Sequence, residues 1–95
     1  MANQTRNLEF LTHTARWPFW PLCPLKRQRK LDDNSSVQEL AILVDFDPPS
    51  GLLRLYTHKD VALNIFTFDL VMPPSGCTCV EVTPGQVVQQ GWEVD

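Results

Sequence analysis

Hydrophobic and polar residues alternate along residues 38–46. The large apolar residues at every second position are Leu40, Ile42, Val44 and Phe46. A period of two places these side chains on one face of an extended chain, so the pattern predicts a β-strand with one strongly apolar face. Asp45 and Asp47 share the other face. We expect them at a solvated strand edge before a turn, rather than in a paired-carboxylate catalytic site.

Four further segments are rich in β-forming residues, namely 52–57, 61–71, 77–82 and 87–94. Segment 61–71 has large apolar residues at both sets of alternating positions, which predicts a strand buried on both sides near the sheet centre. Pro-Pro-Ser-Gly occurs twice, at 48–51 and at 73–76, and is typical of turns. The sequence therefore predicts a mainly β fold, a small antiparallel sheet of four or five strands forming a sandwich, half-barrel or meander.

The first 36 residues have a different pattern. Residues 5–16 carry a narrow apolar stripe that predicts one short helix. Prolines then recur at every third position along 17–24, which favours extended or polyproline geometry. The polar stretch 32–36 is typical of a linker. We therefore expect a proline-rich N-terminal arm at 1–36 and a β domain at 37–95.

Charge divides at the same place. The chain has 95 residues and a net charge of −3. Residues 1–30 contain six basic residues and one acidic residue, whereas residues 31–95 contain two basic and ten acidic residues. Two parts with different tasks would give this asymmetry, and so would a basic arm that pairs with its own acidic sheet.

Composition limits the class of protein. At 43% hydrophobic residues the chain is not disordered along its whole length, and its size allows one domain at most. No apolar run is long enough to span a bilayer, and the N-terminus does not resemble a secretory signal. Three cysteines do not describe a disulfide framework. We expect an intracellular, cytoplasmic protein. The basic residues at 26–30 would also allow import into the nucleus.

Cys77 and Cys79 are the most metal-like pair, because residues two apart on a strand share a face. Structural zinc usually needs four ligands, and Cys23, His13 and His58 would complete a set only by folding back over the sheet. We therefore interpret the cysteines as small buried apolar groups and expect no metal and no cofactor.

No arrangement of residues supports catalysis. The two histidines lack a recognisable nucleophile nearby in sequence, and the glycines occur singly at turns rather than in a phosphate-binding loop. We expect that the protein is not an enzyme.

Three aromatic residues, Trp17, Phe19 and Trp20, are candidate anchors for a protein partner. The alternative is that these rings fold onto the chain's own domain and complete its core. Pro21, Pro24 and Lys26 add the Pro-x-x-Pro-x-basic pattern that SH3-type modules recognise.

The run of basic residues after these prolines is a second candidate site. Its members are Lys26, Arg27, Arg29 and Lys30. Such a cluster resembles a nuclear import signal, or neutralises nucleic-acid phosphates. Four charges are few and the rest of the chain is acidic, so nucleic-acid binding is the runner-up hypothesis.

Residues 37–80 contain an apolar strand, Asp-Pro-Pro-Ser-Gly at 47–51, a second strand and Asp-Leu-Val-Met-Pro-Pro-Ser-Gly at 69–76. This order resembles the C-terminal part of the protruding domain of norovirus-type calicivirus capsid proteins. The resemblance implies a capsid-like surface segment. The stretch 57–61 departs from the family where that family has a strand entry linked to glycan binding, so no glycan-binding residue carries over.

The preferred hypothesis is a non-enzymatic protein–protein interaction module, of the kind found among viral accessory proteins and small adaptors. Its contact surface is the arm or an exposed sheet edge. Strands at 38–46 or 87–94 would also pair with a second copy and give a homodimer, if they lie at the edge of the sheet.

Overall fold

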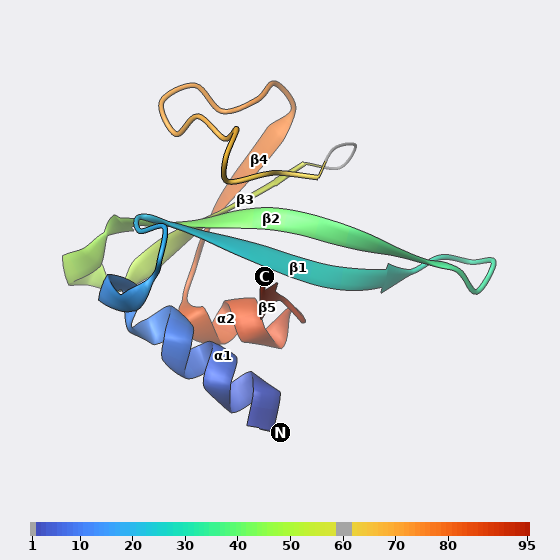
Figure 1. Cartoon of the computed structure of the whole chain (residues 1–95), viewed down its shortest axis with the longest axis horizontal. Coiled ribbons are helices and arrows are strands. Elements are labelled where there is room, and N and C mark those ends of the chain that lie inside the picture. Colours follow the sequence, from blue (N-terminus) through green and yellow to red (C-terminus); the bar gives the residue numbers. More distant parts are fainter. Residues whose placement is uncertain (1, 59–61) are drawn as a thin grey trace.

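The computed structural model describes residues 2–58 and 62–95 (Figure 1). Its elements are α1 (Ala2–Thr12), the 3₁₀-helix η1 (Thr14–Arg16), β1 (Leu22–Lys30), β2 (Ser36–Asp47), the 3₁₀-helix η2 (Pro48–Ser50), β3 (Leu52–His58), β4 (Cys77–Val82), α2 (Pro84–Gln89) and β5 (Glu93–Val94). The strands form one antiparallel sheet in the order β4-β3-β2-β1-β5. The predicted mainly β, antiparallel fold is therefore confirmed.

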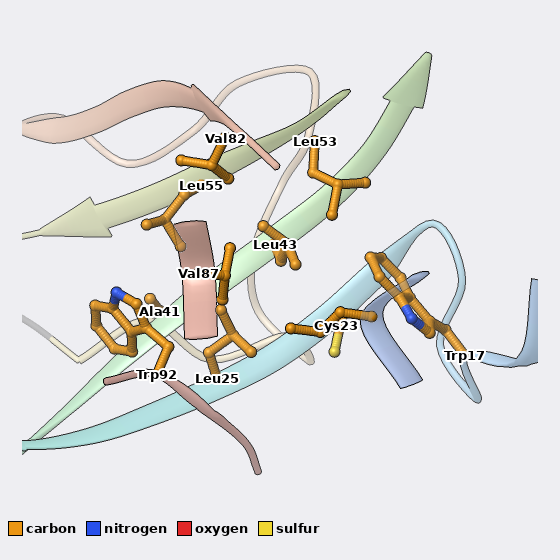
Figure 2. Packing of buried hydrophobic residues seen from close by; sticks show 11 residues of the cluster. Trp17, Cys23, Leu25, Ala41, Leu43, Leu53, Leu55, Val82, Val87 and Trp92 are labelled. Atoms are coloured by element: carbon orange, nitrogen blue, oxygen red, sulfur yellow. The ribbon is translucent and has the colours of Figure 1, made fainter. Parts of the chain in front are cut away.

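The sheet carries a hydrophobic cluster on each face. Helices α1 and α2 lie side by side against one face, and the loop of residues 62–76 lies over the other (Figure 1). The cluster under the helices consists of Leu11, Trp17, Cys23, Leu25, Ala41, Leu43, Leu53, Leu55, Val82, Val87 and Trp92. The cluster under the loop consists of Ile42, Val44, Tyr56 and Leu63. Figure 2 shows the first cluster, with Trp17 and Trp92 at opposite ends.

Strand β2 is buried on both faces. Ala41 and Leu43 belong to the cluster under the helices, whereas Ile42 and Val44 belong to the cluster under the loop. The predicted strand at 38–46 is confirmed, but the expectation of one strongly apolar face was incomplete. The reason is that the helices cover one face of the sheet and the loop of residues 62–76 covers the other. In the strand order β2 is the third of five, so it is not an edge strand.

The predicted central strand at 61–71 was wrong for residues 62–71; residue 61 lies outside the described residues. Asn64 turns the chain here, because its side-chain oxygen accepts from the Phe66 amide at 2.8 Å and its carbonyl accepts from the Phe68 amide at 2.9 Å. Such local bonds compete with a strand ladder. Leu63, Ile65 and Phe68 still pack on the sheet, so the apolar residues cover the β-structure instead of extending it.

The predicted strand at 87–94 was also wrong for most of its length. Thr83 and Gln86 form a capping box, with Pro84 as the next residue, and these start α2. The pattern Thr-x-x-Gln with proline at the first helical position is a helix-start signal that outweighs the weak alternation after it. Only Glu93 and Val94 form a strand, β5, which pairs with β1 at the sheet edge.

Residues 22–30 of the expected arm form β1 rather than a polyproline segment. This strand pairs with β2 over nine residues, from Leu22 opposite Val44 to Lys30 opposite Ser36. Most of the predicted linker at 32–36 lies in the hairpin connection of residues 31–35, in which Asn34 has a φ of 68°, whereas Ser36 begins β2. The basic and acidic parts of the chain therefore meet in one sheet, and Arg27 Nε donates to Glu39 Oε1 across the pair at 3.0 Å.

The helix predicted at 5–16 is present as α1 and η1. Leu11 and Trp17 anchor this segment in the cluster under the helices, and Trp17 Nε1 donates to the Phe10 carbonyl at 3.0 Å. Trp17 is only 4% exposed. For Trp17, therefore, the alternative holds in which the aromatic residue completes the core of its own domain.

Substitution of Trp17 tests this role. We expect Trp17→Ala to lower the free energy of unfolding by about 3–5 kcal/mol, because it empties a buried indole site. Phe19→Ala, in a ring that is 47% exposed, is the matched control. We expect it to cost less than about 1 kcal/mol. Urea unfolding followed by circular dichroism measures both, and equal losses would contradict the assignment.

Candidate functional site

Phe19 and Trp20 remain at the surface, at 47% and 52% exposure. They lie in the connection between η1 and β1, where the Trp20 amide donates to the Trp17 carbonyl at 3.2 Å. The Leu22 amide then donates to the Phe19 carbonyl at 2.8 Å. This tight path separates the three predicted aromatic anchors, because it leaves Trp17 in the core and its two successors outside.

Phe19 contacts a ring that the sequence analysis did not single out. Its centroid lies 5.6 Å from that of Phe66, at an interplanar angle of 84°, which is the favoured edge-to-face geometry. Phe66 is 78% exposed. It was missed because residues 61–71 were expected to be a buried strand. We call Phe19, Trp20 and Phe66 the aromatic surface.

Trp20 is fixed by a buried carboxylate. Its Nε1 donates to Asp45 Oδ2 at 2.9 Å. Asp45 is only 4% exposed, and its amide donates to the Pro21 carbonyl at 2.9 Å. The expectation of a solvated Asp45 was wrong, because the connection into β1 passes over the end of β2. The side chain of Asp47 lies outside the described part of the chain.

A surface hollow of about 300 Å³ lies beside this carboxylate. Its lining residues come from α1, η1, the sheet and the start of α2: they are Leu8, Leu11, Thr12, Thr14, Asp45, Gly51, Leu53, Pro84 and Gly85. We call it the Asp45 hollow. It combines mostly apolar walls with one acidic side chain.

The Pro-x-x-Pro-x-basic segment is part of the sheet. Pro24 lies opposite Ile42, and Lys26 lies between Leu40 of β2 and Glu93 of β5. Pro21, just before the strand, is half-buried. This segment is therefore paired β-structure rather than a free polyproline helix.

The strand also divides the basic cluster. Alternation puts Arg27 and Arg29 on the face under the helices, and Lys26 and Lys30 on the opposite face. Arg27 is bound to Glu39 and lies 4.2 Å above the ring of Trp92. Two of the four charges have acidic partners, since Lys26 Nζ lies 4.0 Å from an Asp95 oxygen.

The three cysteines have three different environments. Cys23 is buried, and this burial raises the pKa of its thiol to about 12. Cys77 is half-buried, and burial again raises its pKa. Cys79 is exposed, so the interpretation of buried apolar cysteines is wrong for this residue. Cys77 and Cys79 alternate with Thr78 on β4 and share a face as predicted.

Both histidines have a ring nitrogen bound to a backbone carbonyl. His13 Nδ1 lies 2.8 Å from the Glu9 carbonyl, and His58 Nε2 lies 2.9 Å from that of Ser75. Within the described ranges 2–58 and 62–95, no three His, Cys, Asp or Glu side chains are grouped to hold a metal ion. In the same part of the chain, no helix has the length and apolar character needed to cross a bilayer.

No family model, curated protein or solved structure matches this chain. The resemblance of residues 37–80 to a calicivirus capsid segment stays a prediction.

The thiol environments predict an order of chemical labelling. With iodoacetamide at mildly alkaline pH, we expect Cys79 to react first, Cys77 more slowly and Cys23 only on unfolding. A pKa near 12 in place of 9.0 lowers the thiolate fraction of Cys23 about a thousandfold. Mass spectrometry of timed digests measures the order. Labelling of Cys23 in the folded protein at the rate of Cys79 would contradict it, and urea-unfolded protein is the control.

Proposed function

We propose that this chain is a non-enzymatic protein-binding module that contacts its partner through the aromatic surface of Phe19, Trp20 and Phe66. The observation that carries the proposal is the edge-to-face pair of Phe19 and Phe66 at the surface of a chain that already buries a cluster on each face of its sheet. Exposed rings grouped in this way are typical of interaction sites.

The energetics favour a partner. Transfer of aromatic surface out of water is favourable by about 25 cal/mol per Å², and aromatic residues dominate binding energy at interfaces. Each ring of the aromatic surface leaves about half of its residue or more in water. A protein partner that covers these rings gains this energy without any rearrangement of the core.

The aromatic surface is also held in place before binding. Trp20 is tied to Asp45 by its indole N–H, and Phe19 is tied to the first residue of β1 by a backbone bond. Side chains that are already ordered lose less conformational entropy when they bind. This supports Trp20 and Phe19, rather than Trp17, as the anchors.

Nucleic-acid binding or nuclear targeting through the basic cluster has less support. Lys26 and Arg27 have acidic partners, and the cluster points to both faces of the sheet. A phosphate backbone would meet only part of it. An SH3-type partner likewise finds Pro24 paired inside the sheet.

A homodimer through a sheet edge remains a further proposal. The edge strands are β4 and β5. Of the two segments predicted to pair with a second copy, 38–46 is interior, and only 87–94 contributes to an edge, through β5. Strand β4 is the longer edge and contains no proline or lysine, the residues that commonly block edge pairing.

Paired substitution of the two contacting rings tests the proposed function. The tagged full chain captures its partner from cells, and quantitative mass spectrometry compares variants. We expect Phe19→Ser with Phe66→Ser to reduce the captured partner at least about tenfold, because both rings belong to the contact.

Leu31→Ser is the matched control, since it removes an exposed apolar side chain at the far end of the β1–β2 hairpin. It should leave capture unchanged, and thermal unfolding verifies that each variant is folded. Retention of the same partner by the double variant would contradict the proposal. Loss of the partner when Arg29 and Lys30 are replaced by alanine, with the rings intact, would instead favour the basic cluster.

A further inference from the structure

Asp45 is a buried acidic residue without a positive partner. In the ranges 6–46, 49–58 and 62–95, ion pairs join Lys26 to Asp95 and Arg27 to Glu39, and no basic side chain reaches the Asp45 carboxylate. Its Oδ2 accepts from Trp20, and no hydrogen bond to its Oδ1 is found among these residues. Oδ1 is not among the fully buried polar atoms that lack a partner, so it keeps contact with water and is open to a donor from another molecule.

The surroundings of this carboxylate suit one type of group. Leu8, Leu11 and Leu53 supply apolar walls to the Asp45 hollow, and Gly51 and Gly85 leave space because they have no side chain. Lysine and arginine side chains place an apolar stem against such walls and a positive head at their end. A charge-assisted hydrogen bond from that head to Oδ1 would supply the missing partner.

Trp20 connects the hollow to the aromatic surface. Its N–H lies 2.9 Å from the Asp45 carboxylate, while about half of the residue is exposed. A segment that covers Trp20 therefore passes beside the hollow. The indole also attracts cations through its ring face.

We propose that the partner inserts one lysine or arginine side chain into the Asp45 hollow when it docks on the aromatic surface. This inference rests on the proposed function and adds the chemical class of the partner: an apolar segment that carries a basic anchor.

None of the residues that line the Asp45 hollow is basic. The described lysine and arginine side chains of the chain therefore do not occupy it, and we assign the occupant to the partner.

A random dodecapeptide library displayed on phage, selected on the purified full chain, tests the inference. We expect the enriched peptides to share aromatic or aliphatic residues and a lysine or arginine at one fixed position. For a selected arginine peptide, replacement of that arginine by citrulline, which is neutral and of nearly equal size, should weaken binding to the unchanged protein about tenfold or more.

Asp45→Asn removes the charge and keeps an acceptor for the Trp20 N–H. On this variant, the arginine and citrulline peptides should bind equally. Glu93→Gln is the matched control, because it neutralises one exposed acidic residue of β5 outside the hollow; it should retain the preference for arginine. Thermal unfolding checks both variants, and the citrulline comparison on the unchanged protein does not depend on them.

The outcomes separate this inference from the proposed function. Enriched peptides that require Phe19 and Phe66 but share no basic position would overturn the inference alone, as would an arginine preference that survives in Asp45→Asn. Peptides that bind independently of both rings, or no enrichment at all, would overturn both. Self-association of the full chain, measured by sedimentation and lost in Asp45→Asn, would make the occupant a second copy and overturn the assignment to a partner.

Discussion

The antiparallel pairing of β1 with β2 is the interaction on which the other features depend. It joins nine residues of each strand, from Leu22 opposite Val44 to Lys30 opposite Ser36. Through it, β2 acquires a neighbour on each side and becomes an interior strand with two buried faces. The same pairing carries the connection before β1 over the end of β2, where Asp45 is enclosed and Trp20 is bound to it. The buried carboxylate and the exposed indole are therefore two results of one strand pairing.

The two faces of the sheet are covered by different means, and this explains where apolar groups stay exposed. Two helices cover one face, and each fully buries an apolar residue there: Leu11 of α1 and Val87 of α2. A loop covers the other face and buries only some of its apolar residues. Hydrogen bonds at Asn64 and Asp69 hold the turns of that loop, and Phe66 is left outside.

Electrostatic pairing follows from the same topology. Of the basic residues of β1, Arg27 lies opposite an acidic residue of β2, Glu39, binds it across the ladder and also covers the ring of Trp92. The buried indole N–H of Trp92 has no hydrogen-bond partner among the described residues, which is a local cost within a well-packed cluster. Two of the six basic residues in the first 30 residues, Lys26 and Arg27, thus have acidic partners within the fold. Asp45, by contrast, accepts from Trp20 but has no basic partner among the described residues, and it lies beside a hollow.

The sequence by itself determined the fold class and the strands at 38–46, 52–57 and 77–82, because alternation and proline–glycine turns are local properties. It did not reveal β1, since prolines obscured a strand whose stability comes from its partner β2. Nor did it show that residues 62–71 form a loop that covers the sheet rather than a buried strand, because the two have similar composition. The pairing of Phe19 with Phe66 and of Trp20 with Asp45 joins residues far apart in the chain. Such contacts depend on which segments lie together, and only the tertiary structure decides that.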